Sequence, residues 1–98
     1  MKYQQDLEET KKYLKERSRP ELENIIAATG LSKQKAKIIL LKYSEEQDRW
    51  FIADEVHCAE TKVSTKTTQA LRKIRNYLIF AGYIKGPSTE QQILQNVL

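Results

Sequence analysis

Apolar residues in the N-terminal third of the chain recur at steps of three, four or seven residues, with Glu and Lys between them. Residues 3–17 contain no Gly or Pro, and their apolar positions lie on one side of a helix. Pro20 disfavours helix at the residue before it but suits a first helical position, so a second helix is expected to begin there. Gly30 is placed to end that helix in a left-handed conformation.

The middle of the chain predicts two further helices. Ser32 is suited to cap a helix from residue 33 to about residue 43, and the apolar end of that helix is expected in the core. Asp48 is suited to cap a helix over residues 49–56. Trp50 and Phe51 in this helix are expected to pack in the core and not to stack on bases.

The longest helix is expected between Thr61 and Phe80. Its buried side is predicted from steps of three and four residues. This side consists of Val63, Thr67, Ala70, Leu71, Ile74, Tyr77, Leu78 and Ala81. Gly82 should end the helix, and Tyr83 should fold back on its last turn. A short amphipathic helix is expected in residues 88–98, with Ile93, Leu94, Val97 and Leu98 on its apolar side.

These segments predict an all-α fold, a small multi-helix domain, because no segment alternates with period two over enough residues to form a strand. Residues 82–86 are compatible with a minimal wing. The apolar stripe of Leu7 and Leu14 in the first helix, like the tail helix, is expected either to pack on the same domain or to contact a partner.

Composition limits the classes of function. The chain has 98 residues, enough for one small domain with a limited core, and its net charge is +4. A single cysteine, Cys58, excludes an internal disulfide, and the absence of a signal-like or membrane-spanning apolar run predicts a cytoplasmic protein. There is no paired nucleophile and base, no Gly-rich phosphate loop and no metal-ligand spacing, so we expect neither an enzyme nor a cofactor or metal site.

Residues 52–63 have the pattern of a helix-turn-helix. This motif needs a small residue where its two helices cross, and apolar residues that hold the pair together. Ala53 is the small residue, and the apolar contacts are expected from Ile52, Val56, Cys58 and Val63.

Polar and basic residues project from the other side of the second helix of this pair. The residues predicted to face the major groove and read base edges are Glu60, Thr61, Ser64, Thr65 and Thr68. Those predicted to contact phosphates are Lys62, Lys66, Arg72, Lys73 and Arg75. Residues 61–89 contain six basic side chains and no acidic one, so positive charge is concentrated in this part of the chain.

Residues 38–75 resemble region four of the sigma-70 family and the small phage-encoded ArpU-type late-gene regulators. Leu41-Lys-Tyr43 is similar to the apolar-Arg-Tyr that closes the preceding helix in that family. Ile52-Ala53 is similar to its Glu-Ile-Ala, and Ala70-Leu71-Arg-Lys-Ile74 to its Ala-Leu-x-x-Leu. The chain departs from the pattern at His57, where Gly is usual, and at Lys66, where an apolar residue is usual.

The resemblance implies a sequence-specific duplex-DNA-binding transcriptional regulator encoded by a phage or mobile element, and it adds Ala59 to the groove-facing residues. Ala59 stands where a capping Ser is expected. The implied partner is double-stranded DNA, together with either RNA polymerase or a second copy of the chain, because a single half-site contact rarely specifies enough sequence. We divide the chain into an N-terminal helix or interaction arm (1–19), a helix-turn-helix DNA-binding domain (20–86) and a C-terminal amphipathic helix (87–98).

An earlier pair of segments also matches a helix-turn-helix. Residues 22–37 contain a Gly30-Leu-Ser32 turn, followed by the polar residues Lys33, Gln34, Lys35 and Lys37. Ile26 falls where the small crossing residue should be, so we favour the later motif. Two other functions remain as alternatives: the DNA-recognition subunit of a phage packaging terminase, and a helical adaptor or assembly protein whose basic face meets an acidic protein surface.

Overall fold

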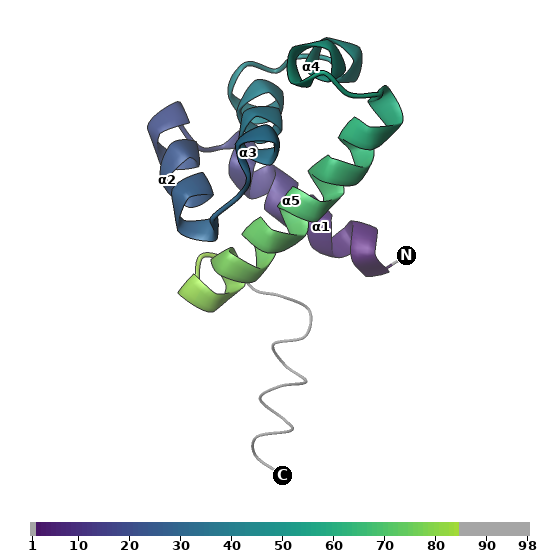
Figure 1. Ribbon diagram of the computed structural model, residues 1–98. Coiled ribbons are helices and arrows are strands. Elements are labelled where there is room, and N and C mark those ends of the chain that lie inside the picture. The colour runs from purple at the N-terminus through teal and green to yellow at the C-terminus, as the bar shows by residue number, and fades with distance from the viewer. Residues whose placement is uncertain (1, 85–98) are drawn as a thin grey trace.

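The computed structural model describes residues 2–84, with side chains from Leu7 onward, and every regular element in that range is helical (Figure 1). The elements are α1 Lys2–Lys15, α2 Arg19–Thr29, α3 Lys33–Ile39, the π-helical segment η1 Leu40–Ser44, α4 Arg49–Val56 and α5 Glu60–Ala81. The long helix α5 contacts each of the other α-helices, and Figure 1 shows α1 crossing it and α4 lying near its N-terminal end. The expectation of a small all-α domain is confirmed.

Helix ends follow the local chemistry of the sequence. Ser18 caps α2 through a capping box with Glu21, so each side chain accepts a backbone N–H of the other residue. Gly30 ends α2 with a φ of 66°, and the Ser32 side chain accepts a hydrogen bond at the start of α3, as predicted. Asp48 occupies the N-cap position of α4, but its side chain forms no capping hydrogen bond.

The helix expected over residues 33–43 changes geometry at its centre. After α3 the backbone widens into η1, where the Glu45 N–H donates to the Leu40 carbonyl at 3.1 Å. The continuous apolar run in α3 and η1 is divided between two parts of the core. Ile38 and Leu41 pack toward α4, whereas Ile39 and Tyr43 pack toward α1 and α2.

The core therefore consists of two clusters joined by α5. The larger cluster buries Leu7, Leu14, Leu22, Ile25, Ile39, Tyr43, Ala70, Leu71, Ile74 and Leu78. The smaller cluster buries Ile38, Leu41, Ile52, Ala53, Val56 and Val63. Because Leu7 and Leu14 are buried against this core, the apolar stripe of α1 is used inside the domain.

The prediction that Trp50 packs in the core is wrong. Its side chain is 62% exposed, while Phe51 is half-buried beside the smaller cluster. The helix α4 has apolar residues on more than one side, and at eight residues it is too short to bury them all. Ile52, Ala53 and Val56 take the inward side.

The C-terminal end of α5 closes as expected, but the prediction that Ala81 lies on its buried side is wrong, because Ala81 is exposed. Gly82 ends the helix with a φ of 84°, and the Tyr83 N–H donates to the Leu78 carbonyl at 2.8 Å. The Tyr83 ring lies 6.1 Å from the Tyr13 ring and 6.3 Å from the Tyr77 ring, centroid to centroid. The structure shows a turn and bends, not a strand, over residues 82–84; the rest of the expected wing and the tail helix lie outside the described residues.

No helix between residues 2 and 84 combines the length and apolarity needed to cross a bilayer.

Candidate nucleic-acid interface

The turn between α4 and α5 closes around a left-handed histidine. His57 has φ 58° and ψ 49°, a conformation that costs a residue with a Cβ roughly 1 kcal/mol. Its N–H donates to the Asp54 carbonyl at 3.3 Å, and the Cys58 N–H donates to the Ala53 carbonyl at 3.0 Å. These two hydrogen bonds form a Schellman-type end for α4. His57 therefore adopts the left-handed conformation that Gly usually takes at such a helix end.

The two helices are held together by the smaller core cluster. Ala53 is 7% exposed, and its small side chain lets α5 approach α4 closely. Ile52 and Val56 on α4 pack with Val63 on α5, and Ile38 and Leu41 close the cluster from the other side. The orientation of the first turns of α5 is therefore set by buried contacts.

Opposite this cluster, the first turns of α5 present a hydroxyl-rich surface. Of the six predicted base-reading residues, five are exposed and one, Thr68, is half-buried. The exposed ones are Ala59, Glu60, Thr61, Ser64 and Thr65. Steps of four, three and four residues align Thr61, Thr65, Thr68 and Arg72 along one side of the helix. The Thr65 hydroxyl donates to the Thr61 carbonyl at 3.3 Å and keeps lone pairs available as acceptors.

The predicted phosphate-contacting residues lie on α5 around this surface. Lys62, Lys66 and Lys73, separated by four and seven residues, follow one edge of it, and Arg75 lies along the opposite edge with Ser64 and Thr68. Lys62, Arg72 and Lys73 are exposed, whereas Lys66 and Arg75 are half-buried. Cations thus border the hydroxyl-rich surface on both sides.

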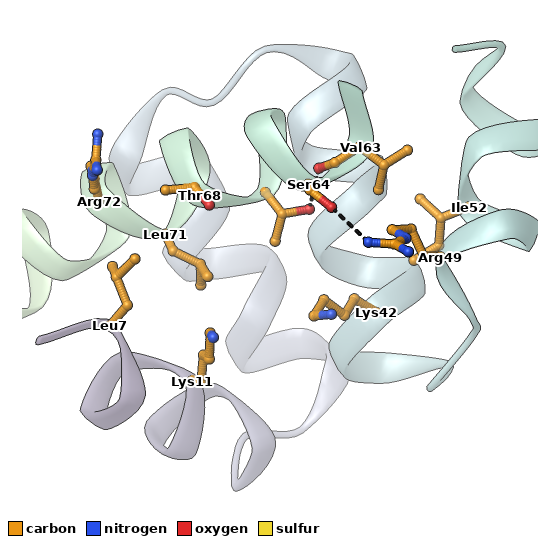
Figure 2. A pocket seen from close by; sticks show the side chains of 11 residues that line it. Leu7, Lys11, Lys42, Arg49, Ile52, Val63, Ser64, Thr68, Leu71 and Arg72 are labelled. Carbon is orange, nitrogen blue, oxygen red and sulfur yellow. Dashed lines mark hydrogen bonds between the residues drawn. The ribbon is translucent and has the colours of Figure 1, made fainter. Parts of the chain in front are cut away.

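Arg49, the first residue of α4, connects α4 to this surface. Its Nη1 donates to Ser64 Oγ at 3.1 Å, drawn as the dashed line in Figure 2, and its Nε lies 3.7 Å from Glu60 Oε1. The guanidinium therefore holds the hydroxyl of Ser64 in place and offsets the charge of the Glu60 carboxylate. Both residues are among those predicted to read bases. Arg49 lies eleven residues before Glu60 in a different helix, so its place beside α5 cannot be inferred from helical spacing.

A shallow groove of about 370 Å³ runs beside the same surface, between α1, η1, α4 and α5 (Figure 2). The basic residues along it are Lys11, Lys42, Arg49 and Arg72, and the hydroxyls are those of Ser64, Thr67 and Thr68. Its apolar lining consists of Leu7, Ile52, Val63 and Leu71. Among the described residues that line the groove, none is acidic.

The cations of this groove influence one another. Desolvation lowers the pKa of Lys42, and the positive charges of Lys11, Lys15 and Arg49 lower it further. Like Arg49, Lys11 and Lys42 are residues that sequence reasoning missed. Lys11 follows Glu8 and Glu9 in a mixed-charge helix, so only the folded structure reveals that it shares a surface with α5.

The earlier helix pair uses its polar residues differently. Gln34 Nε2 donates to the Val56 carbonyl at 3.1 Å, and Lys37 Nζ donates to the Glu55 carbonyl at 3.4 Å. Both side chains thus satisfy carbonyls at the C-terminal end of α4. Two of the four residues that this motif would use for base contacts are therefore engaged within the domain.

Among residues 2–84 no group of three or more His, Cys, Asp and Glu side chains is arranged to hold a metal ion. No family model matches the sequence, and neither a curated protein nor a solved structure does.

Proposed function

We propose that the chain is a sequence-specific duplex-DNA-binding regulator of transcription, in which α4 and α5 act as a helix-turn-helix resembling sigma region four and the ArpU-type regulators. The observation that supports this most strongly is the exposed surface of α5 around Thr61 and Thr65, which is rich in hydroxyls and bordered by cations on both sides. The first turns of α5 would enter the major groove.

The chemistry of this surface suits a duplex. An α-helix has the width of the major groove, and Thr and Ser hydroxyls can donate to or accept from base edges. Phosphate strands flank that groove on both sides, where the lysines of one edge and Arg75 on the other would contact them, and Arg72 would reach a phosphate beyond Thr68. Thr and Ser are mediocre helix formers, so their accumulation in the first turns of α5 is better explained by contact with a ligand than by helix stability.

The later helix pair is the better candidate for base contacts. In the earlier pair, Gln34 and Lys37 are hydrogen-bonded to α4, whereas Thr61 and Thr65 are exposed. The earlier pair would then support the orientation of α4 and, through it, that of α5.

The partners proposed with this function follow from the size of the interface. One helix in one major groove contacts few bases, so useful specificity needs a second copy of the chain or RNA polymerase. A bound sequence that is palindromic would indicate a dimer, and light scattering with and without DNA would measure it.

Selection of bound sequences from random duplexes, followed by a salt titration on the selected duplex, tests the proposal. Five phosphate contacts predict that the logarithm of affinity falls against the logarithm of salt concentration with a slope of about −4.5. A slope near zero, or no enriched sequence, would contradict the proposal. Binding of an acidic protein surface in its place would favour the adaptor alternative.

A further inference from the structure

Four cations from four separate elements meet along the groove beside α5: Lys11 on α1, Lys42 on η1, Arg49 on α4 and Arg72 on α5. Figure 2 shows Arg49 and Arg72 toward opposite ends of the groove, with Lys11 and Lys42 between them on the side facing α5. A second, more open groove shares Lys11 and Lys42 and adds Lys15, but its lining is of mixed charge because Glu8 and Glu46 also border it. None of this arrangement is visible in the charge pattern of α5 alone.

We propose that the groove is a phosphate-binding site, occupied in the DNA complex by a backbone phosphate of the duplex whose major groove holds α5. This inference rests on the proposed function and extends it, because it makes α1 and η1 part of the DNA interface. Lysine and arginine side chains supply charge and donors, and the hydroxyls of Ser64 and Thr68 supply two further donors.

The apolar lining strengthens the expected attraction. Leu7, Ile52, Val63 and Leu71 form low-dielectric walls beneath the cations, and a cleft lined by one sign of charge on such walls concentrates the electric field. Desolvation, and to a lesser extent the neighbouring cations, lower the pKa of Lys42, so an anion in the groove would stabilise its charged form.

The ion pair made by Lys11 is weak enough to give way to a phosphate. Lys11 Nζ lies 3.3 Å from Glu8 Oε1 in a pair whose carboxylate is 69% exposed, and exposed pairs contribute less than about 1 kcal/mol. Ser64 and Thr68 belong both to the groove and to the predicted base-reading surface. A duplex in one orientation can therefore contact both the groove and the base-reading surface.

Salt titrations of two variants on the selected duplex test the proposal. Lys11→Gln and Lys42→Gln should each make the log-log slope less steep, by up to about 0.9, the value for loss of the whole phosphate contact, without changing the selected sequence. Lys12→Gln is the matched control, because Lys12 is an exposed neighbour on α1 that does not line the groove, and it should leave the slope unchanged. Wild-type slopes in both groove variants would overturn the proposal.

Titration of the wild-type chain with inorganic phosphate, followed by amide NMR shifts, separates this proposal from the proposed function. Shifts confined to residues around Ser64, Thr68 and Lys42 support a phosphate site. If the wild-type chain binds no duplex, the proposed function fails. Shifts at the groove would then indicate that the groove binds a free phosphate compound and not DNA. The absence of such shifts would overturn the groove as a phosphate site in either case.

Discussion

Arg49 Nη1 donates a 3.1 Å hydrogen bond to Ser64 Oγ and thereby joins the first residue of α4 to the second turn of α5. The same guanidinium lies 3.7 Å from the Glu60 carboxylate. The pair is exposed, so its contribution to folding is small, but it determines where one hydroxyl points and offsets an acidic charge on a surface proposed to meet DNA.

Replacing Arg49 by Ala should weaken duplex binding roughly tenfold, because the variant loses a cation and leaves the Glu60 charge uncompensated. The free energy of unfolding should fall by less than about 1 kcal/mol. Fluorescence anisotropy and chemical denaturation would measure the two effects. Arg19→Ala is the matched control, since Arg19 also begins a helix and pairs with two carboxylates, those of Glu23 and Glu45. Equal losses of affinity in both variants would show that only net charge matters.

Replacing His57 by Gly should stabilise the domain by about 1 kcal/mol, because His57 has a φ of 58° and Gly adopts that conformation without a Cβ penalty. The thermal midpoint should rise by roughly 4–8 °C, as measured by circular dichroism. Gly30→Ala is the reverse experiment. Gly30 has a φ of 66° with open space around its Cβ position, so the substitution should cost about 1 kcal/mol from backbone conformation alone. A less stable His57→Gly variant would mean that the His57 side chain contributes more than its strain costs.

Stability should decrease in alkaline solution through Tyr43. Burial, with a smaller contribution from the Glu8 charge, raises the pKa of its phenol from 10.0 to about 12. The folded chain therefore holds this proton more tightly than the unfolded chain. The resulting stabilisation is complete below pH 10 and is lost as the pH rises through about 12, with a total of at most roughly 3 kcal/mol.

Tyr43→Phe removes this titration. The Tyr43 hydroxyl is buried and makes no hydrogen bond to the described residues, so the variant should be at least as stable as the wild type near neutral pH. Between the two pKa values the wild type should lose stability relative to the variant, as measured by denaturant unfolding at each pH. Parallel pH profiles for the two proteins would assign the alkaline loss to other groups.

The hydrogen bond from Gln34 to the Val56 carbonyl predicts a structural role for Gln34. Gln34→Ala should lower the free energy of unfolding by about 1 kcal/mol and leave the selected duplex sequence unchanged. Denaturation and repeated selection would measure these effects. A change in preference at one base position would instead indicate that the earlier helix pair reads the DNA.

Local chemistry was sufficient to predict most helix boundaries. Gly30, Ser32 and Gly82 each act within a few residues of their own position, so their roles as caps can be inferred without the fold. The exposure of Trp50 could not be predicted in this way. The helix α4 has apolar residues on several sides, and only its packing against α3 and α5 decides which of them are buried.

The candidate site was predicted in part. The residues on α5 follow from helical periodicity, since they share one element. Lys11, Lys42 and Arg49 come from three other elements and have no shared spacing in the sequence, so their meeting at one groove depends on how α1 and α4 pack on α5.

The most direct test of the proposed role of α5 is duplex retention by a variant that carries Thr61→Ala, Thr65→Ala and Lys66→Gln, compared with the wild type on the selected duplex. The control carries Asn24→Ala and Lys12→Gln, which likewise remove an exposed polar group and one positive charge, but on α2 and α1. We predict that the α5 variant remains folded and loses sequence-specific retention, while the control binds as the wild type does. Unchanged binding by the folded α5 variant would contradict the assignment of α5 as the DNA-reading helix.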